Sequence, residues 1–134
     1  MAAAVAEELA AGRSLGVPLP DPANLDWVRI AEPSDVRLLA MVADLGAGER
    51  ASLALALATP DALVILDDLL ARRHADALGI RYTGTLGVLL RAKASGLIPA
   101  VGPVLTALAT CGFRLSPDTR DAVLRRAGEP ATGI

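Results

Sequence analysis

The spacing of hydrophobic positions changes several times along the chain, and each change marks the edge of an expected helix or strand. The alanine-rich residues 2–11 predict a first helix that ends at Gly12, because glycine suits the position after a helix. The aromatic and β-branched run Trp27–Ala31 predicts a strand, which Pro33 closes. The continuous apolar run Ala62–Leu66 lies between aspartates and is typical of a buried strand in a parallel sheet.

Further helices are expected between these strands and after the last of them. They are expected at residues 36–44, 49–59, 69–78, 86–95, 103–111 and 117–127, with a further brief strand at 80–82. Asp35, Asp68 and Ser116 precede three of the helices and have the side-chain oxygen that caps a first turn. The helix at 49–59 is apolar on almost every face, which predicts neighbours on more than one side. The alternation of strands and helices predicts an α/β chain with a parallel sheet.

The length and composition narrow the class of protein. A length of 134 residues suits one domain, 1–134, whose final helix and tail occupy residues 115–134. The chain is 53% hydrophobic, which excludes a disordered protein, and its longest apolar runs fall far short of the roughly 18 residues that a membrane span needs. We therefore expect no membrane partner. One cysteine, Cys111, and an amino terminus unlike a secretory signal predict a cytoplasmic location.

The charge of the chain excludes one simple binding mode. The formal net charge is −2, which removes the overall positive surface of a simple double-stranded DNA binder and leaves a local basic groove possible. His74 has no second histidine or cysteine at ligand spacing, so we expect a surface or packing role for it and no zinc site. The sequence also lacks the motifs of a serine hydrolase elbow and of a phosphate-binding loop.

Acidic residues near the expected element ends are candidate metal ligands. Asp67 follows the strand Ala62–Leu66, at the carboxyl end where sites of parallel sheets form, and Asp68 beside it suits a helix cap. Glu49 opens a helix, where it either complements the helix dipole or binds a metal. Glu8 lies in the first helix, on either a solvated or an inward face. If Glu8, Glu49 and Asp67 converge, they supply the hard oxygen ligands that Mg²⁺ and Mn²⁺ prefer.

Several segments in combination resemble the PIN-domain proteins, and most closely the prokaryotic VapC-like toxins. The segments are Val5–Leu9, Leu45–Ala56, Val64–Asp68, Leu78–Ile80, Thr83–Leu90, Gly96–Ile98 and Gly112–Phe113. Together they extend over almost the whole chain. The resemblance implies a three-layer sandwich in which helices flank a small parallel sheet.

The resemblance also implies a function, a metal-dependent endoribonuclease that hydrolyses RNA phosphodiesters with Mg²⁺ or Mn²⁺. Matched residue by residue, the catalytic and metal-binding acids are Glu8, Glu49 and Asp67, with Asp68 as an auxiliary ligand or a cap. Arg72 contacts substrate phosphate or, equally well, forms a salt bridge. The implied partners are the RNA substrate, an antitoxin protein and a second copy in a homodimer.

The sequence departs from the family pattern in two places. The family opens with a strand, a helix and a second strand, and the aspartate that ends its first strand is the leading metal ligand, whereas nothing of this precedes Met1. Ala47 and Ala51 also occupy places where relatives often have acids. Ribonuclease activity is therefore expected if that aspartate is encoded upstream. The alternative function is a non-catalytic module that binds protein or nucleic acid and pairs through an open sheet edge.

Overall fold

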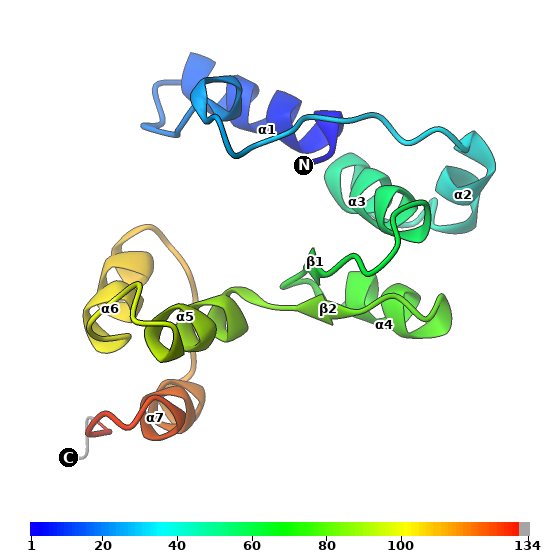
Figure 1. The fold of residues 1–134 in the computed structure, drawn as a ribbon. Helices are drawn as coiled ribbons and strands as arrows, with labels where there is room; N and C mark the ends of the chain where they lie inside the picture. Colours follow the sequence, from blue (N-terminus) through cyan, green and yellow to red (C-terminus); the bar gives the residue numbers. More distant parts are fainter. Residues whose placement is uncertain (132–134) are drawn as a thin grey trace. The chain divides into compact units, whose positions relative to one another are not determined.

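The computed structural model describes residues 1–131, which form two compact units, one of Met1–Thr83 and one that begins at Gly84 (Figure 1). The α/β prediction is confirmed, because the described residues contain seven α-helices, one short 3-10 helix and a parallel two-stranded sheet. The single domain 1–134 stays a prediction. Of the predicted tail 115–134, residues 132–134 lie outside the described residues.

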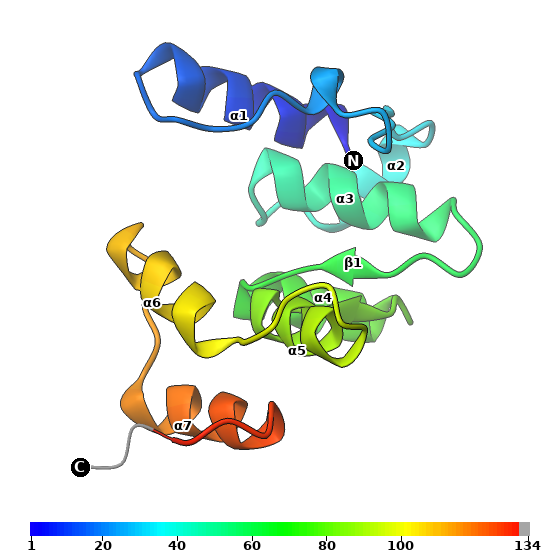
Figure 2. The ribbon, with the colours of Figure 1, turned by 60° about the vertical axis from the view of Figure 1, so that its left-hand side comes forward.

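The amino-terminal unit is a stack of helices on the two faces of a small sheet. Its elements are α1 (Ala3–Ser14), η1 (Pro22–Asn24), α2 (Val36–Met41), α3 (Ala47–Leu57), β1 (Val64–Ile65), α4 (Leu69–Ala77) and β2 (Tyr82–Thr83). α3 lies between α1 and β1, and α4 lies on the other side of β1 (Figures 1 and 2). Leu53, Val64 and Ala75 meet in the core of this unit. The neighbours on both sides of α3 confirm what its all-round apolar pattern predicted.

The sheet consists of two short parallel strands. Val64 pairs with Tyr82 and Ile65 with Thr83, which confirms a strand within the run 62–66. The second strand lies at Tyr82–Thr83 and not at 80–82, because Ile80 is buried in the core immediately after the left-handed turn at Gly79 (φ 68°).

Among the described residues, β1 is paired along one edge only. The amide of Val64 donates to the carbonyl of Arg81, immediately before β2, at 3.0 Å, and the amide of Leu66 donates to that of Thr83 at 2.7 Å. The amide and carbonyl of Ile65 between them therefore point to the opposite edge. No strand among the described residues pairs with that edge. The Ile65 side chain is 60% exposed, whereas the run 62–66 predicted a strand covered on both faces. We call this edge the open edge of β1.

The predicted strand Trp27–Ala31 is wrong. Only Ala31 forms a β-bridge, an isolated parallel one to Ala2, and Trp27 is 79% exposed. An aromatic and β-branched run favours a strand because such side chains pack well on a covered, pleated surface. Here Trp27 lies in a turn, closed by a hydrogen bond from the Val28 amide to the Leu25 carbonyl at 3.0 Å, and its side chain is largely exposed, so the segment does not form a strand.

Three helix boundaries also differ from the sequence-based expectation. α1 continues through Gly12 and ends before Gly16, whose φ of 84° makes it the left-handed residue after the helix. A Cβ at position 12 would lie 2.6 Å from Leu19 Cδ1, so the glycine there makes room for Leu19. α2 ends at Met41 and not at residue 44, because Val42 turns into the core. α3 begins at Ala47, two residues before Glu49.

The three predicted caps are confirmed. The side-chain oxygens of Asp35, Asp68 and Ser116 accept hydrogen bonds from first-turn amides at 2.9, 2.9 and 3.1 Å. Each bond satisfies an amide that has no partner inside its own helix. The side-chain chemistry at these positions therefore sets where α2, α4 and α7 begin.

The carboxyl-terminal unit is helical and has its own core. Its elements are α5 (Thr85–Ala94), α6 (Gly102–Thr110) and α7 (Pro117–Arg126), close to the bounds expected from the sequence. Val101, Leu105, Val123 and Leu124 are its buried residues, and partly buried leucines of α5 pack against them. None of the helices among the described residues has the length and apolar character to cross a membrane.

Candidate metal-binding pocket

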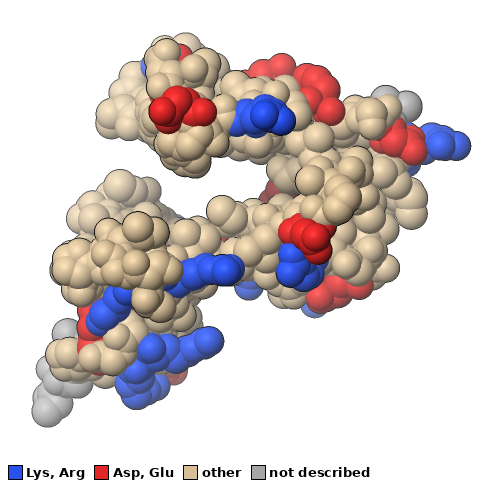
Figure 3. Space-filling view, in the orientation of Figure 1, with Lys and Arg blue, Asp and Glu red and all other residues tan. Residues whose placement is uncertain are grey.

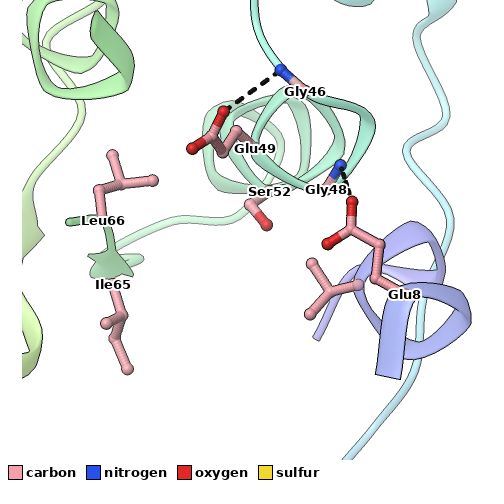
Figure 4. Close-up of a pocket in the computed structure, with 8 residues that line it drawn as sticks. Glu8, Gly46, Gly48, Glu49, Ser52, Ile65 and Leu66 are labelled. Atoms are coloured by element: carbon pink, nitrogen blue, oxygen red, sulfur yellow. Dashed lines mark hydrogen bonds between the residues drawn. The ribbon is translucent and has the colours of Figure 1, made fainter. Parts of the chain in front are cut away.

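A pocket of about 350 Å³ opens in the amino-terminal unit at the start of α3 (Figure 4). Side chains from α1 and α3 and the end of β1 line it. Two of the predicted site residues, Glu8 and Glu49, are among the lining residues, together with Ser52. The pocket therefore brings together two acids that lie 41 positions apart in the sequence.

Glu8 reaches the pocket from α1 and is fixed by α3. Its Oε1 accepts a hydrogen bond from the amide of Gly48 at 3.1 Å. A Cβ at position 48 would lie 2.9 Å from both carboxylate oxygens of Glu8, closer than side-chain carbons pack. Gly48 therefore lets the Glu8 carboxylate pack directly against the backbone of α3 and binds it through its amide. The partial positive charge at the amino end of α3 also favours this anion.

Glu49 lies in the first turn of α3. Its Oε2 accepts a hydrogen bond from the amide of Gly46 at 3.2 Å, which completes one half of a capping box. This is the helix-start role expected as one alternative for Glu49, and the same side chain also lines the pocket. In Figure 4 the second oxygen of each carboxylate lies on the side that faces β1, with Ser52 between the two acids.

Asp67, Asp68 and Arg72 form a separate group after β1. Asp68 is used as the cap of α4, in agreement with one of its predicted roles. Arg72 forms a salt bridge to Asp67 at 3.6 Å and donates from Nε to the carbonyl of Leu66 at 2.9 Å. Its guanidinium also lies 5.9 Å from the centre of the Tyr82 ring. Of the two roles predicted for Arg72, the salt bridge is therefore present.

The predicted convergence of three acids is only partly observed. Glu8 and Glu49 line one pocket, but no three Asp, Glu, His or Cys residues within the described part of the chain form a metal-binding group. Two carboxylates and a serine hydroxyl are nevertheless hard oxygen donors of the kind that Mg²⁺ and Mn²⁺ take. Mg²⁺ in particular is held by one or two protein carboxylates while it keeps several waters. The pair fits such an ion.

His74 lies outside this pocket. Its Nε2 is 2.9 Å from Asp44 Oδ1, and this hydrogen bond holds the pKa of Asp44 below its ordinary value. The pair joins α4 to the segment that follows α2. The contact agrees with the packing role expected for this histidine.

A family model described as a PIN domain matches residues 1–129. The chain belongs to the PIN-domain family. The resemblance found in the sequence is thereby confirmed at the level of the family, and its closest subgroup, the VapC-like toxins, stays a prediction. No curated protein and no solved structure matches the chain.

Membership of the PIN-domain family indicates which chemistry the pocket could support. The PIN domain is a nuclease-type fold, and PIN domains generally use divalent metal ions. Sequence reasoning had selected both acids of the pocket but had missed Gly48 and Ser52. The available signal was the short side chain at each position, since Gly48 and Ser52 lie one turn apart on either side of the charged pair Glu49 and Arg50.

Proposed function

We propose that this PIN domain is a cytoplasmic, metal-dependent endoribonuclease of the VapC-like toxin type that uses Mg²⁺ or Mn²⁺. One observation carries the proposal. Glu8 and Glu49 reach the same pocket from two helices, and an amide at the start of α3 holds each carboxylate. Hydrogen bonds that orient metal ligands are a general requirement of metal sites, and both acids have one.

The roles of the residues follow from these contacts. Glu8 and Glu49 would hold a divalent ion, and the amides of Gly48 and Gly46 would keep the two carboxylates in place. Such an ion, when bound, would supply Lewis-acid chemistry for the phosphodiester. The Ser52 hydroxyl, between the two acids, donates a hydrogen bond to a substrate oxygen or to water. Asp67 is proposed as a third acid of the site, and its salt bridge to Arg72 holds the chain after β1.

The test is cleavage of mixed-sequence RNA in the presence of Mg²⁺ or Mn²⁺. We expect cleavage when the chain is extended upstream to supply the family's leading aspartate. In that protein we expect a loss of at least about 100-fold for Glu8→Gln and for Glu49→Gln, because each removes a metal ligand. Glu7→Gln is the matched control, since Glu7 is the adjacent acid on α1 and does not line the pocket. Equal activity in all four proteins would refute the assignment.

The predicted roles of Asp67 and Asp68 are separated by a second pair of variants. We expect Asp67→Asn to lower cleavage and to leave the folded state intact. Asp68→Ala removes a cap and is expected to lower stability with little change in cleavage. If Asp67→Asn cleaves RNA as fast as the unchanged chain, Asp67 has no catalytic part.

The open edge of β1 favours a second candidate function, a module that pairs with a second copy of the chain. Ile65 is 60% exposed beside backbone groups that have no strand partner among the described residues. Two copies related by a two-fold axis present this same edge to one another, so pairing satisfies both at once.

Light scattering over a range of concentrations tests the pairing. We expect a dimer that Ile65→Lys converts to a monomer, while Leu15→Lys, a control at a position 84% exposed in the same unit, leaves the dimer unchanged. A monomer at every concentration would exclude this function.

A further inference from the structure

The charges of the chain are divided unevenly between its two units. Six of the 13 cationic side chains but only three of the 15 acids lie in the carboxyl-terminal unit. Its formal net charge is therefore +3, while the amino-terminal unit, which holds the pocket, carries −5. These opposite charges partly cancel, so the formal net charge of the whole chain is only −2. A basic region within an acidic chain is a feature of proteins that bind nucleic acid.

The cations of the carboxyl-terminal unit gather at one end of two helices. Arg91 and Lys93 lie in the last turn of α5, and Arg125 and Arg126 in the last turn of α7. Lys93 Nζ is 2.8 Å from Oε1 of Glu129, which follows α7 by three residues, so the two helix ends lie close together. Figure 3 shows Lys and Arg side chains over α5 and α7. We call these four residues the basic end.

Most of the charge at the basic end is not neutralised by the protein itself. Glu129 forms an ion pair with Lys93 and its side chain is only 13% exposed. Its carboxylate therefore does not neutralise the three arginines. Arg91, Arg125 and Arg126 are exposed, and within the described part of the chain none of them forms an ion pair. The other acids of the unit, Asp118 and Asp121, lie earlier in α7.

Helix dipoles account for part of this arrangement but not for all of it. A cation in the last turn complements the negative end of a helix and contributes about 0.3–1 kcal/mol. Here each last turn has two, and three of the four are arginines, whose planar guanidinium matches the oxygens of a phosphate. Three arginines without an ion pair in the described part of the chain suit a ligand that carries several phosphate groups.

We propose that Arg91, Arg125 and Arg126 bind the phosphodiester backbone of the RNA on which this nuclease acts. The inference extends the proposed function, and its choice of RNA rests on it. Contacts to phosphate hold a strand without reading its sequence. Binding at the basic end is therefore expected to depend strongly on salt and weakly on base composition.

The experiment measures binding and not cleavage, so that a chain without nuclease activity still gives an answer. Fluorescence anisotropy of a labelled single-stranded RNA of mixed sequence is recorded in EDTA, from about 50 to 200 mM salt. Three phosphate contacts correspond to an affinity loss on the order of 20-fold over this range. In the triple variant Arg91→Gln, Arg125→Gln and Arg126→Gln, we expect weaker binding at 50 mM salt and the disappearance of this part of the salt dependence.

A matched control removes the same charge from the other unit. Arg29→Gln, Arg37→Gln and Arg73→Gln change three exposed arginines of the amino-terminal unit and are expected to leave most of the binding unchanged. Circular dichroism checks that both triple variants are folded. The proposal is overturned if the unchanged chain does not bind RNA, if the two triple variants lose binding equally, or if polyglutamate competes as well as RNA.

Discussion

The contact between Gly48 and Glu8 leads to a prediction that separates stability from function. In Gly48→Ala, the new Cβ would lie 2.9 Å from both Glu8 oxygens, about 0.5 Å short of the closest ordinary contact. The main chain of α3 is held by its neighbours, whereas the carboxylate is the far end of a flexible side chain. We therefore expect the carboxylate to leave the pocket and α3 to stay in place.

The expected change in stability is small because two effects oppose each other. A hydrogen bond to a charged group contributes roughly 1.5–3 kcal/mol, and the exposure of Glu8 places this one at the lower limit. Alanine is favoured over glycine within a helix by about 0.5–1 kcal/mol. The net loss in the free energy of unfolding is thus about 1 kcal/mol. Affinity for Mn²⁺ is expected to fall by about 10–100-fold, as when other residues that orient a metal ligand are changed.

The assay is a double-mutant cycle, with urea unfolding for stability and calorimetric titration of Mn²⁺ for binding. When Glu8 is first changed to Ala, the clash is absent, and Gly48→Ala is expected to stabilise the chain by about 0.5–1 kcal/mol. Gly46→Ala is the control, because a Cβ there would lie 3.4 Å from Glu49, an ordinary contact. Equal effects of Gly48→Ala with and without Glu8 would refute the reasoning.

Three further predictions concern stability and are checked by urea unfolding. Leu53→Ala is expected to cost about 2–5 kcal/mol, because Leu53 is completely buried in the core, and a smaller loss would mean that the core closes over the cavity. Asp68→Ala is expected to cost about 1 kcal/mol through loss of the α4 cap, and an unchanged midpoint would contradict this. The hydrogen bond from Lys93 and those from the amides of Val101 and Gly102 lower the pKa of Glu129 to about 2 from its ordinary 4.5. Its contribution to stability is therefore present above pH 4.5 and is lost as the pH falls from there to about 2, whereas Glu129→Gln is expected to lack this loss.

The local features of the fold were predictable because neighbours in sequence create them. The caps at Asp68 and Ser116 depend on a side chain and an amide three residues later, so the sequence shows both partners of each bond. The strand Trp27–Ala31 failed because its formation depends on what covers Trp27, and no pattern within the segment contains that information. A prediction from the sequence was therefore correct where the contacting residues are close together in the sequence, whatever the type of element.

The same division holds for the candidate site. Glu8 and Glu49 were selected as carboxylates near element ends, but their shared pocket depends on α1 packing against α3. Gly48 was missed because its role is defined by Glu8, which lies 40 positions away. Asp67 was expected to join them, yet its position is determined by the turn that Arg72 holds after β1.

Glu129 determines how far the chain must extend for the carboxyl-terminal unit to keep its contacts. It binds Lys93, Val101 and Gly102, and thus closes a loop of the chain between residues 93 and 129 without a covalent bond. The match to the family also ends at this residue. A protein shortened to residue 128 would lose the only anion on the first turn of α6 that the described residues supply. In practical terms, a shortened chain must extend at least to residue 129, and a fusion or tag must begin after it, if the carboxyl-terminal unit is not to be loosened.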